Sequence, residues 1–319
     1  MEEERRFLEK YENQVLPFYS SGRFGEFSGA GGLKIRTVAF EKEQASGALV
    51  ILPGKSETYL KYAEFFYDLQ DLPLSLYAMD HRGMGFSERP LPDRLKIHVE
   101  RFDNYVEDLT TFMDTVVSAG GYENLYLFGH STGALIAAVY MEAHPETFRA
   151  GVLCSPFFDV ATGLVPGFLT RFLAGLLDRP GRSREYGPGQ RDLQRPEFQN
   201  NKISNCYPRW SLWEKDLIPN NEAIQFGGVT NHWLHESLMA GVRAVKGAGK
   251  ISVPLLILQA EQDSIVRLSA QDRFCRRAPR CRKILIRGAK HEILIEQDDT
   301  RTEAIARIKD FLTTRLKGT

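Results

Sequence analysis

The sequence predicts an α/β fold in which a mostly parallel sheet is flanked by helices on both faces and interrupted by one inserted segment. Between residues 33 and 141, short apolar strands alternate with helical patterns, and the same alternation returns after residue 254. Between about residues 156 and 240 the alternation breaks, and this interval holds all three tryptophans. Strands linked by helical crossovers form parallel sheets covered on both faces.

The first half of the chain supplies most of the predicted sheet. Residues 33–40 alternate in side-chain character as a half-buried strand does, and 47–52 form a continuous apolar run that ends at Pro53-Gly54. Such a run is typical of a strand buried on both faces. The elements that follow are a helix at 59–69, a strand at 74–79, a helix at 102–117, a strand at 125–128 and a helix at 134–141.

The second half completes the same fold. Residues 254–258 and 283–286 are predicted strands, separated by a basic helix through 273–277 and followed by a final helix at 300–316. We therefore expect a core made of residues 1–155 and 241–319, with residues 156–240 inserted as a mostly helical lid.

Charge and length limit the functions that this chain can have. Its 319 residues are 43% hydrophobic, enough for a large core. Lysine plus arginine and aspartate plus glutamate both count 41, so the net charge is zero and no overall field attracts nucleic acid. We expect no nucleic-acid partner.

The N-terminus and the cysteines point to a cytoplasmic protein without metal. The chain starts with acidic and basic residues where a secretory signal would be apolar, and no apolar run is long enough to span a bilayer. Its cysteines, Cys154, Cys206, Cys275 and Cys281, show no CxxC or histidine spacing, so we expect neither a disulfide nor a zinc site.

The strongest chemical motif is Gly129-His130-Ser131-Thr132-Gly133. It follows a predicted strand and opens an apolar helix of small residues, which is the context of a nucleophile elbow. At such a sharp turn, side chains two positions before and after the serine would collide, so both glycines have a steric reason. The turn would present the Ser131 hydroxyl at the positive end of a helix dipole.

A serine hydroxyl needs a base, and in this fold an acid and then a histidine follow the serine along the chain. His291 lies in a loop just beyond a predicted strand, whereas His232 and His235 lie in the inserted segment, so we assign His291 as the base. The loop after the 254–258 strand offers Glu261 and Asp263. We choose Asp263 for its shorter side chain and keep Glu261 as the alternative.

The negative charge that develops on the substrate needs two backbone donors. The elbow supplies the N–H of Thr132, and the loop Pro53-Gly54-Lys55-Ser56-Glu57 after the buried strand supplies that of Lys55.

Several motifs resemble the lysophospholipase and monoacylglycerol-lipase branch of the α/β-hydrolases. They cover nearly the whole chain and comprise residues 57–62, 80–87, 129–133, 232–233, 273–275 and 288–294. The turn Asp80-His81-Arg82-Gly83-Met84-Gly85-Phe86-Ser87 and the pair His232-Trp233 are more specific than the elbow, and we interpret the turn as a buried brace for the active site. One departure is Pro53-Gly54, where the branch often has His-Gly. It removes the histidine side chain from the oxyanion loop but leaves the backbone N–H of Lys55 as a donor.

The resemblance implies a serine hydrolase with the triad Ser131, Asp263 and His291 that cleaves carboxylic esters of single-chain lipids, either lysophospholipids or monoacylglycerols. The alternative is an esterase or thioesterase for small acyl substrates, because triad and fold do not fix the substrate. Phe168, Leu169 and Leu173 lie on an apolar helical face of the lid, so we expect them to bind the acyl chain or to touch a membrane; the alternative is that this face only packs on the core. No cofactor is implied, and the protein would be free in the cytoplasm or peripheral on the inner membrane face.

Overall fold

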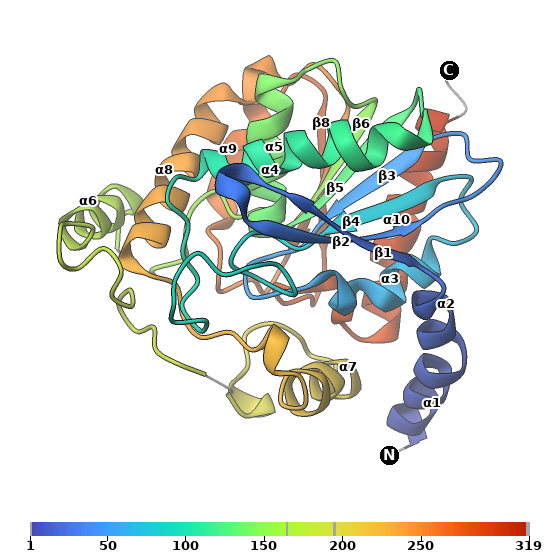
Figure 1. Ribbon diagram of the computed structural model, residues 1–319, viewed down its shortest axis with the longest axis horizontal. Helices are drawn as coiled ribbons and strands as arrows, with labels where there is room; N and C mark the ends of the chain where they lie inside the picture. Colours follow the sequence, from blue (N-terminus) through green and yellow to red (C-terminus); the bar gives the residue numbers. More distant parts are fainter. Residues whose placement is uncertain (1, 164, 194–195, 317–319) are drawn as a thin grey trace.

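One eight-stranded sheet organises the chain (Figure 1). The computed structural model describes residues 2–163, 165–193 and 196–316. The strand order is β1-β2-β4-β3-β5-β6-β7-β8, with antiparallel pairing of β1 with β2 and of β2 with β4 and parallel pairing of all the other neighbours. The strands are β1 Arg23–Ser28, β2 Lys34–Phe40, β3 Ala48–Leu52, β4 Ser75–Met79, β5 Leu125–His130, β6 Ala150–Cys154, β7 Leu255–Ala260 and β8 Cys281–Ile286.

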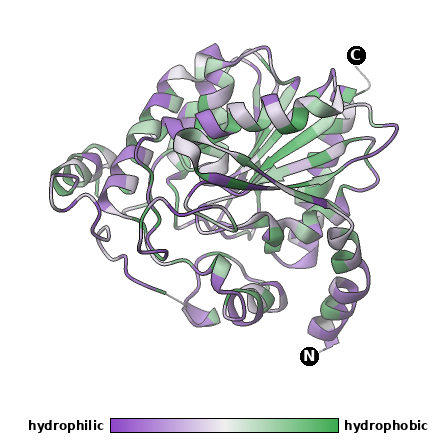
Figure 2. Cartoon of the chain, in the orientation of Figure 1, coloured by the Kyte–Doolittle hydropathy of each residue, from purple (hydrophilic) through white to green (hydrophobic). Residues whose placement is uncertain are grey.

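Helices cover both faces of the sheet, as the sequence predicts. One apolar core lies between the sheet and α4, α5, α8 and α9, and a second lies between the sheet and α1, α2, α3 and α10. The apolar strands run between these helical layers (Figure 2). The bounds are α1 Glu2–Lys10, α2 Leu16–Ser20, α3 Ala63–Asp68, α4 Asp103–Phe112, α5 Thr132–Ala143, α8 Asn231–Gly247, α9 Leu268–Arg277 and α10 Asp298–Leu316.

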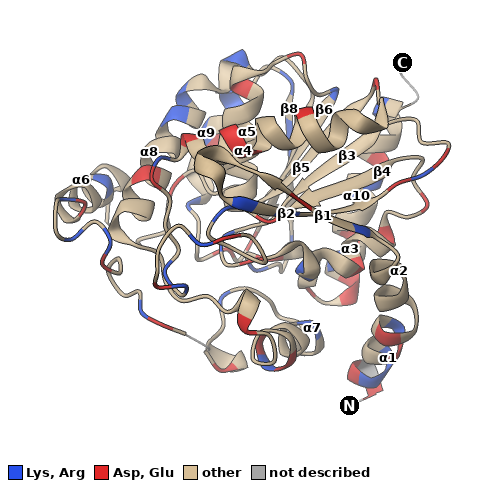
Figure 3. Cartoon of the chain, in the orientation of Figure 1, with Lys and Arg blue, Asp and Glu red and all other residues tan. Residues whose placement is uncertain are grey.

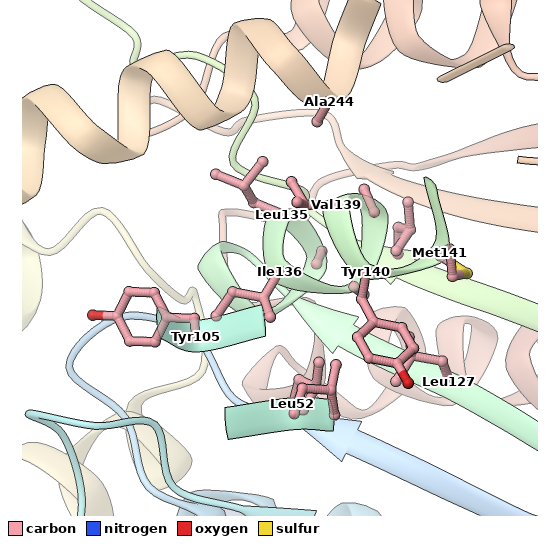
Figure 4. Packing of buried hydrophobic residues seen from close by; sticks show 14 of the residues in the cluster. Leu52, Tyr105, Leu127, Leu135, Ile136, Val139, Tyr140, Met141 and Ala244 are labelled. Carbon is pink, nitrogen blue, oxygen red and sulfur yellow. The ribbon is translucent and has the colours of Figure 1, made fainter. Parts of the chain in front are cut away.

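Helix α5 is buried along almost its whole length. It packs on the sheet with one side and on α8 with the other, so its residues are apolar or small (Figure 4). Leu135, Ile136 and Tyr140 are in the same cluster as Leu52 of β3 and Leu127 of β5. This packing fixes the N-terminus of α5 at the carboxyl ends of the central parallel strands, where ligands bind in open α/β sheets.

The connection between β6 and β7 holds the segment that breaks the sequence rhythm. It contains α6 (Gly167–Leu177), α7 (Tyr207–Ser211) and then α8. In Figure 1, α6 lies at the left edge and α7 below the sheet. Helix α8 crosses residue 240 and packs against α5 and α9. The helices that cover the sheet therefore resume at residue 231.

The expectation of no disulfide is wrong. Cys275 in the last turn of α9 and Cys281 at the start of β8 form a disulfide, with their Cα atoms 5.3 Å apart. The helix ends at Arg277 and the strand begins at Cys281, so a short turn brings the two side chains together within disulfide range. Their separation of six residues matches no spacing motif and gave no sign of the pairing.

Charges of both signs are interspersed over the chain (Figure 3), in keeping with the balanced composition. Among the described residues, no helix combines the length and the apolar character needed to cross a membrane.

Candidate active site

Ser131 occupies the sharp turn between β5 and α5. Its backbone is in an unusual conformation, with φ of 50° and ψ of −113°, and its N–H donates to the carbonyl of Cys154 on the neighbouring strand at 2.9 Å. The glycines are required: a Cβ on Gly129 would lie 2.6 Å from the Gly133 oxygen, and one on Gly133 would lie 2.2 Å from the Leu52 oxygen. The sequence motif thus forms the strained strand-to-helix turn of a nucleophile elbow.

The structure brings Ser131, His291 and Asp263 together in one hydrogen-bonded chain. The Ser131 hydroxyl lies 2.9 Å from His291 Nε2, and His291 Nδ1 lies 2.7 Å from Asp263 Oδ2. Ser131 and His291 are 6% and 4% exposed, so water has little access to the proton path. This geometry lets the imidazole accept the serine proton while the carboxylate holds its other nitrogen.

Asp263 is fixed as an anion by its surroundings. Its Oδ1 accepts the backbone N–H groups of Ile265 and Val266, at 2.9 and 3.1 Å, which leaves Oδ2 for His291. Burial alone would raise the pKa of Asp263, but His291 and these backbone donors outweigh burial and hold the pKa below its ordinary value. The alternative, Glu261, is exposed and accepts the N–H of Gly288 instead.

Both expected oxyanion donors border the same cavity as Ser131. Thr132 is the first residue of α5, so its N–H has no acceptor within the helix, and Lys55 lies in the loop after β3. The turn 80–87 braces that loop: His81 Nε2 donates to the Pro53 carbonyl at 2.9 Å. The buried Asp80 carboxylate anchors the turn by accepting N–H groups from Tyr59 and Phe86.

The cavity beside Ser131 has a volume of about 810 Å³, within the usual range of small-molecule sites. Trp213 and Trp233 are two of its large apolar walls. The other apolar walls are Phe157, Val160, Leu193, Ile203, Ile218, Phe226, Val229, Leu234 and Ile265. The lining also includes polar side chains such as Gln190 and Asn200 and the charged residues Lys55, Glu57, Lys61, Arg191, Lys202, Glu214 and Glu292. The site therefore suits a substrate with an apolar body and a polar end.

Comparison with known proteins places this geometry in a family. Residues 43–298 match the family described as "Serine aminopeptidase, S33". The chain belongs to this family of α/β-hydrolases.

Two relatives are similar in sequence to this S33-family hydrolase over most of its length. Lysophospholipase L2 of Escherichia coli strain K12 is 34% identical over 305 residues, which cover 93% of this chain and 89% of that protein. Probable lysophospholipase L2 of Haemophilus influenzae is 30% identical over 301 residues, which cover 94% and 95%.

A solved structure supports the fold. A soluble variant of monoglyceride lipase from Saccharomyces cerevisiae, in complex with a substrate analog, matches with a TM-score of 0.73. The match covers 92% of this chain and 94% of that one at 18% identity. At this identity the likeness concerns the fold alone.

We expect Phe168, Leu169 and Leu173 of the S33-family hydrolase to bind the acyl chain or to touch a membrane, and the structure does not place them at the acyl site. All three lie on the outer face of α6, exposed by 68%, 38% and 47%, and none borders the cavity beside Ser131. The inner face of α6 carries Ala174, its only buried residue among those described, and packs on α8. The apolar stripe predicted from helical spacing exists, but it points to solvent.

Sequence reasoning missed a group of buried charges behind the triad of this hydrolase. Glu57, Lys61, His130 and Glu292 all border the cavity, yet each has little exposure. All four lie within the motifs 57–62, 129–133 and 288–294, but nothing in the spacing of these motifs indicates that the side chains meet. Among the described residues, no three His, Cys, Asp or Glu side chains are grouped as a metal site would need.

Proposed function

We propose that this chain is a serine carboxylic ester hydrolase that cleaves single-chain lipids, lysophospholipids or monoacylglycerols, through an acyl-enzyme on Ser131. The observation that carries the proposal is the hydrogen-bonded chain from Ser131 through His291 to Asp263, which opens into a large, mostly apolar cavity.

The geometry supports a two-step mechanism. His291 Nε2 takes the proton of the Ser131 hydroxyl as its oxygen attacks the acyl carbonyl carbon, and Asp263 stabilises the imidazolium. The N–H groups of Lys55 and Thr132 hold the oxyanion. When the carbon–oxygen bond breaks, the imidazolium gives its proton to the departing alcohol. Water then attacks the acyl-enzyme with the same base, releasing the fatty acid and restoring Ser131.

The cavity and the relatives together favour a lipid with one acyl chain. A cavity of about 810 Å³ with large apolar walls can hold one flexible chain, whereas a triacylglycerol would have to leave two chains outside. The relatives named lysophospholipase L2 act on a lipid with one acyl chain by name. The alternative, an esterase or thioesterase for small acyl groups, uses the same triad.

The outer face of α6 supplies a surface for a membrane, and we include peripheral membrane contact in the proposal. Phe168, Leu169, Phe172, Leu173 and Leu176 form one exposed apolar stripe. The exposed Arg179 and Arg184 follow the helix. Apolar side chains beside basic ones suit the boundary between acyl chains and anionic headgroups. The occupant we propose is therefore the surface of a bilayer that contains anionic lipid.

A substrate panel tests the function. Rates should be measured on a lysophospholipid, a monoacylglycerol, a triacylglycerol, an acyl-CoA thioester and short-chain esters, with Ser131→Ala as the inactive control. We expect single-chain lipids to be hydrolysed fastest. Faster cleavage of the thioester or of short esters would favour the alternative. A wild-type protein that neither turns over esters nor reacts with a fluorophosphonate would refute the hydrolase assignment.

A further inference from the structure

Charged side chains form a compact buried cluster immediately behind the triad. Glu57 and His130 are 3% and 4% exposed, and the side chains of Lys61 and Glu292 are 6% and 11% exposed. Burying charge is costly unless each charge is paired. Four paired ionisable groups next to the site therefore need an explanation, because a buried ion pair is weak evidence for a gain in fold stability.

Glu57 is held as a carboxylate by the donors around it. Its Oε2 accepts the N–H of Gly54 at 2.5 Å and the hydroxyl of Tyr62 at 2.6 Å, and its Oε1 faces the Lys61 ammonium at 3.2 Å. Burial alone would raise the pKa of Glu57, but Lys61, His130 and these hydrogen bonds outweigh it, so the pKa falls well below its ordinary value.

The ring of His130 is enclosed by acceptors. Its Nδ1 lies 3.2 Å from Glu57 Oε2, and its Nε2 lies 3.3 Å from the backbone carbonyl oxygen of His291. A neutral imidazole has one donor and one acceptor nitrogen, so it can serve only one of these partners. Both partners are satisfied at once only by an imidazolium. Burial would lower the pKa of His130, but the charge and hydrogen bond of Glu57 raise it above its ordinary value.

We propose that Glu57 and His130 are a positioning pair: Glu57 holds His130 as an imidazolium, and His130 donates to the His291 carbonyl and so fixes the loop that carries the catalytic imidazole. This inference rests on the proposed function, because it needs His291 to be the base.

The pair reaches three of the four loops that carry the site, all but that of Asp263. Glu57 holds the oxyanion loop through the Gly54 N–H, and His130 is the elbow residue directly before Ser131. Lys61 adds a second connection to the histidine loop through its ion pair with Glu292, at 2.5 Å. One carboxylate therefore couples the placement of the oxyanion donor, the nucleophile and the base. Because displacing a catalytic group by about 1 Å can cost about a hundredfold in rate, this coupling has a kinetic consequence.

Two substitutions of His130 separate positioning from stability. In His130→Gln the amide nitrogen falls near the place of imidazole Nε2 and can still donate to the His291 carbonyl. In His130→Asn the amide reaches only the place of Nδ1, so the bond to Glu57 can form but the bond to His291 is lost. Both variants remove the ring and its charge, which makes each the control for the other.

The measurements are kcat and KM on a soluble short-chain ester, together with the melting temperature of each variant. We expect kcat of His130→Asn to be about a hundredfold lower than that of the wild type, with KM within about twofold. The kcat of His130→Gln should be about tenfold higher than that of His130→Asn. Both variants should melt at similar temperatures. Equal kcat in the two variants, or a wild-type kcat in His130→Asn, would overturn the positioning role.

Nitrogen NMR of the histidine rings tests the charge state without any substrate. At pH 7 the two ring nitrogens of His130, assigned by their disappearance in His130→Gln, should both be protonated. Glu57→Gln should leave one of them bare. A neutral His130 ring in the wild-type protein would overturn the proposal.

Fluorophosphonate labelling distinguishes failure of the pair from failure of the enzyme assignment. A wild-type protein that is not labelled at Ser131 would overturn both proposals. A labelled wild type with an unaffected His130→Asn would overturn this one only.

Discussion

Replacing Asp263 by asparagine should nearly abolish turnover without changing the shape of the site. The two carboxylate oxygens have different tasks: Oδ1 accepts backbone N–H groups from Ile265 and Val266, and Oδ2 faces His291 Nδ1. An asparagine must keep its oxygen toward the two N–H groups, so its amide nitrogen faces His291. Two donors cannot share a hydrogen bond, so Nδ1 has to lose its proton and accept.

The consequence is the wrong imidazole tautomer. With Nδ1 accepting, the ring proton sits on Nε2, which faces the Ser131 hydroxyl at 2.9 Å and can no longer take its proton. The same tautomer error in a serine protease costs about 10⁴ in kcat, which corresponds to roughly 5.4 kcal/mol of transition-state stabilisation. Because the side chain of Asp263 has no exposed surface, water cannot replace the lost acceptor.

The assay is kcat on a soluble ester, and Glu261→Gln is the matched control. Glu261 is exposed, and its glutamine replacement keeps an oxygen for the Gly288 N–H, so its rate should stay within about twofold of wild type. Melting temperatures should confirm that both variants fold. A loss of less than about tenfold in Asp263→Asn, or a larger loss in Glu261→Gln, would refute the tautomer reasoning.

Three further predictions concern the nucleophile, α6 and pH. Ser131→Ala should lower ester turnover at least about a thousandfold with an unchanged melting temperature; more than a tenth of the wild-type rate would contradict its role. Phe168→Asp should weaken binding to anionic vesicles at least about tenfold and slow long-chain but not short-chain hydrolysis, which sedimentation and a chain-length series would test. Burial lowers the pKa of His232, but hydrogen bonds to the Glu100 carbonyl and Asp178 outweigh it and raise the pKa. The stability that His232 contributes is therefore full below about pH 6.5 and lost as pH rises through the higher folded pKa. Urea unfolding of wild type and His232→Gln should be compared from pH 6 to 9. The difference between their free energies of unfolding should shrink as the pH rises, and a constant difference would contradict the prediction.

The sequence was most informative where a local pattern determines structure. The buried apolar run at 47–52 became β3, and the pattern at 102–117 became α4 and its continuation through Val117. Strand β6 was not predicted, because Ala150-Gly151-Val152-Leu153-Cys154 is a brief run with a glycine. The N-terminal helix α1 is mostly charged and has little periodic apolar signal. Edge strand β1 alternates exposed and half-buried positions, which gave it no distinct apolar face.

The triad and the buried charges differ in how far a sequence can reveal them. Ser131, Asp263 and His291 are predicted from the elbow motif and from the order of strand ends, and in the structure their side chains form one hydrogen-bonded chain. The contact of Glu57 with His130 joins residues 73 apart, and no spacing rule connects the two. Such pairs depend on how the loops converge above the sheet, which residue types alone do not specify.

Helix α6 shows why periodicity cannot assign a surface to a partner. Apolar residues at helical spacing indicate one apolar face, but they do not say whether that face meets the core or the solvent. In this structure, polar contacts tie α6 to its surroundings: Arg171, within the helix, pairs with Asp159, and Asp178 at its C-terminal end binds His232 and His235. Because its apolar stripe faces outward, only the small inner side of α6, with Ala174, is buried against the core by the hydrophobic effect. These polar contacts therefore determine which way the stripe points, and they lie in the tertiary structure rather than in the spacing.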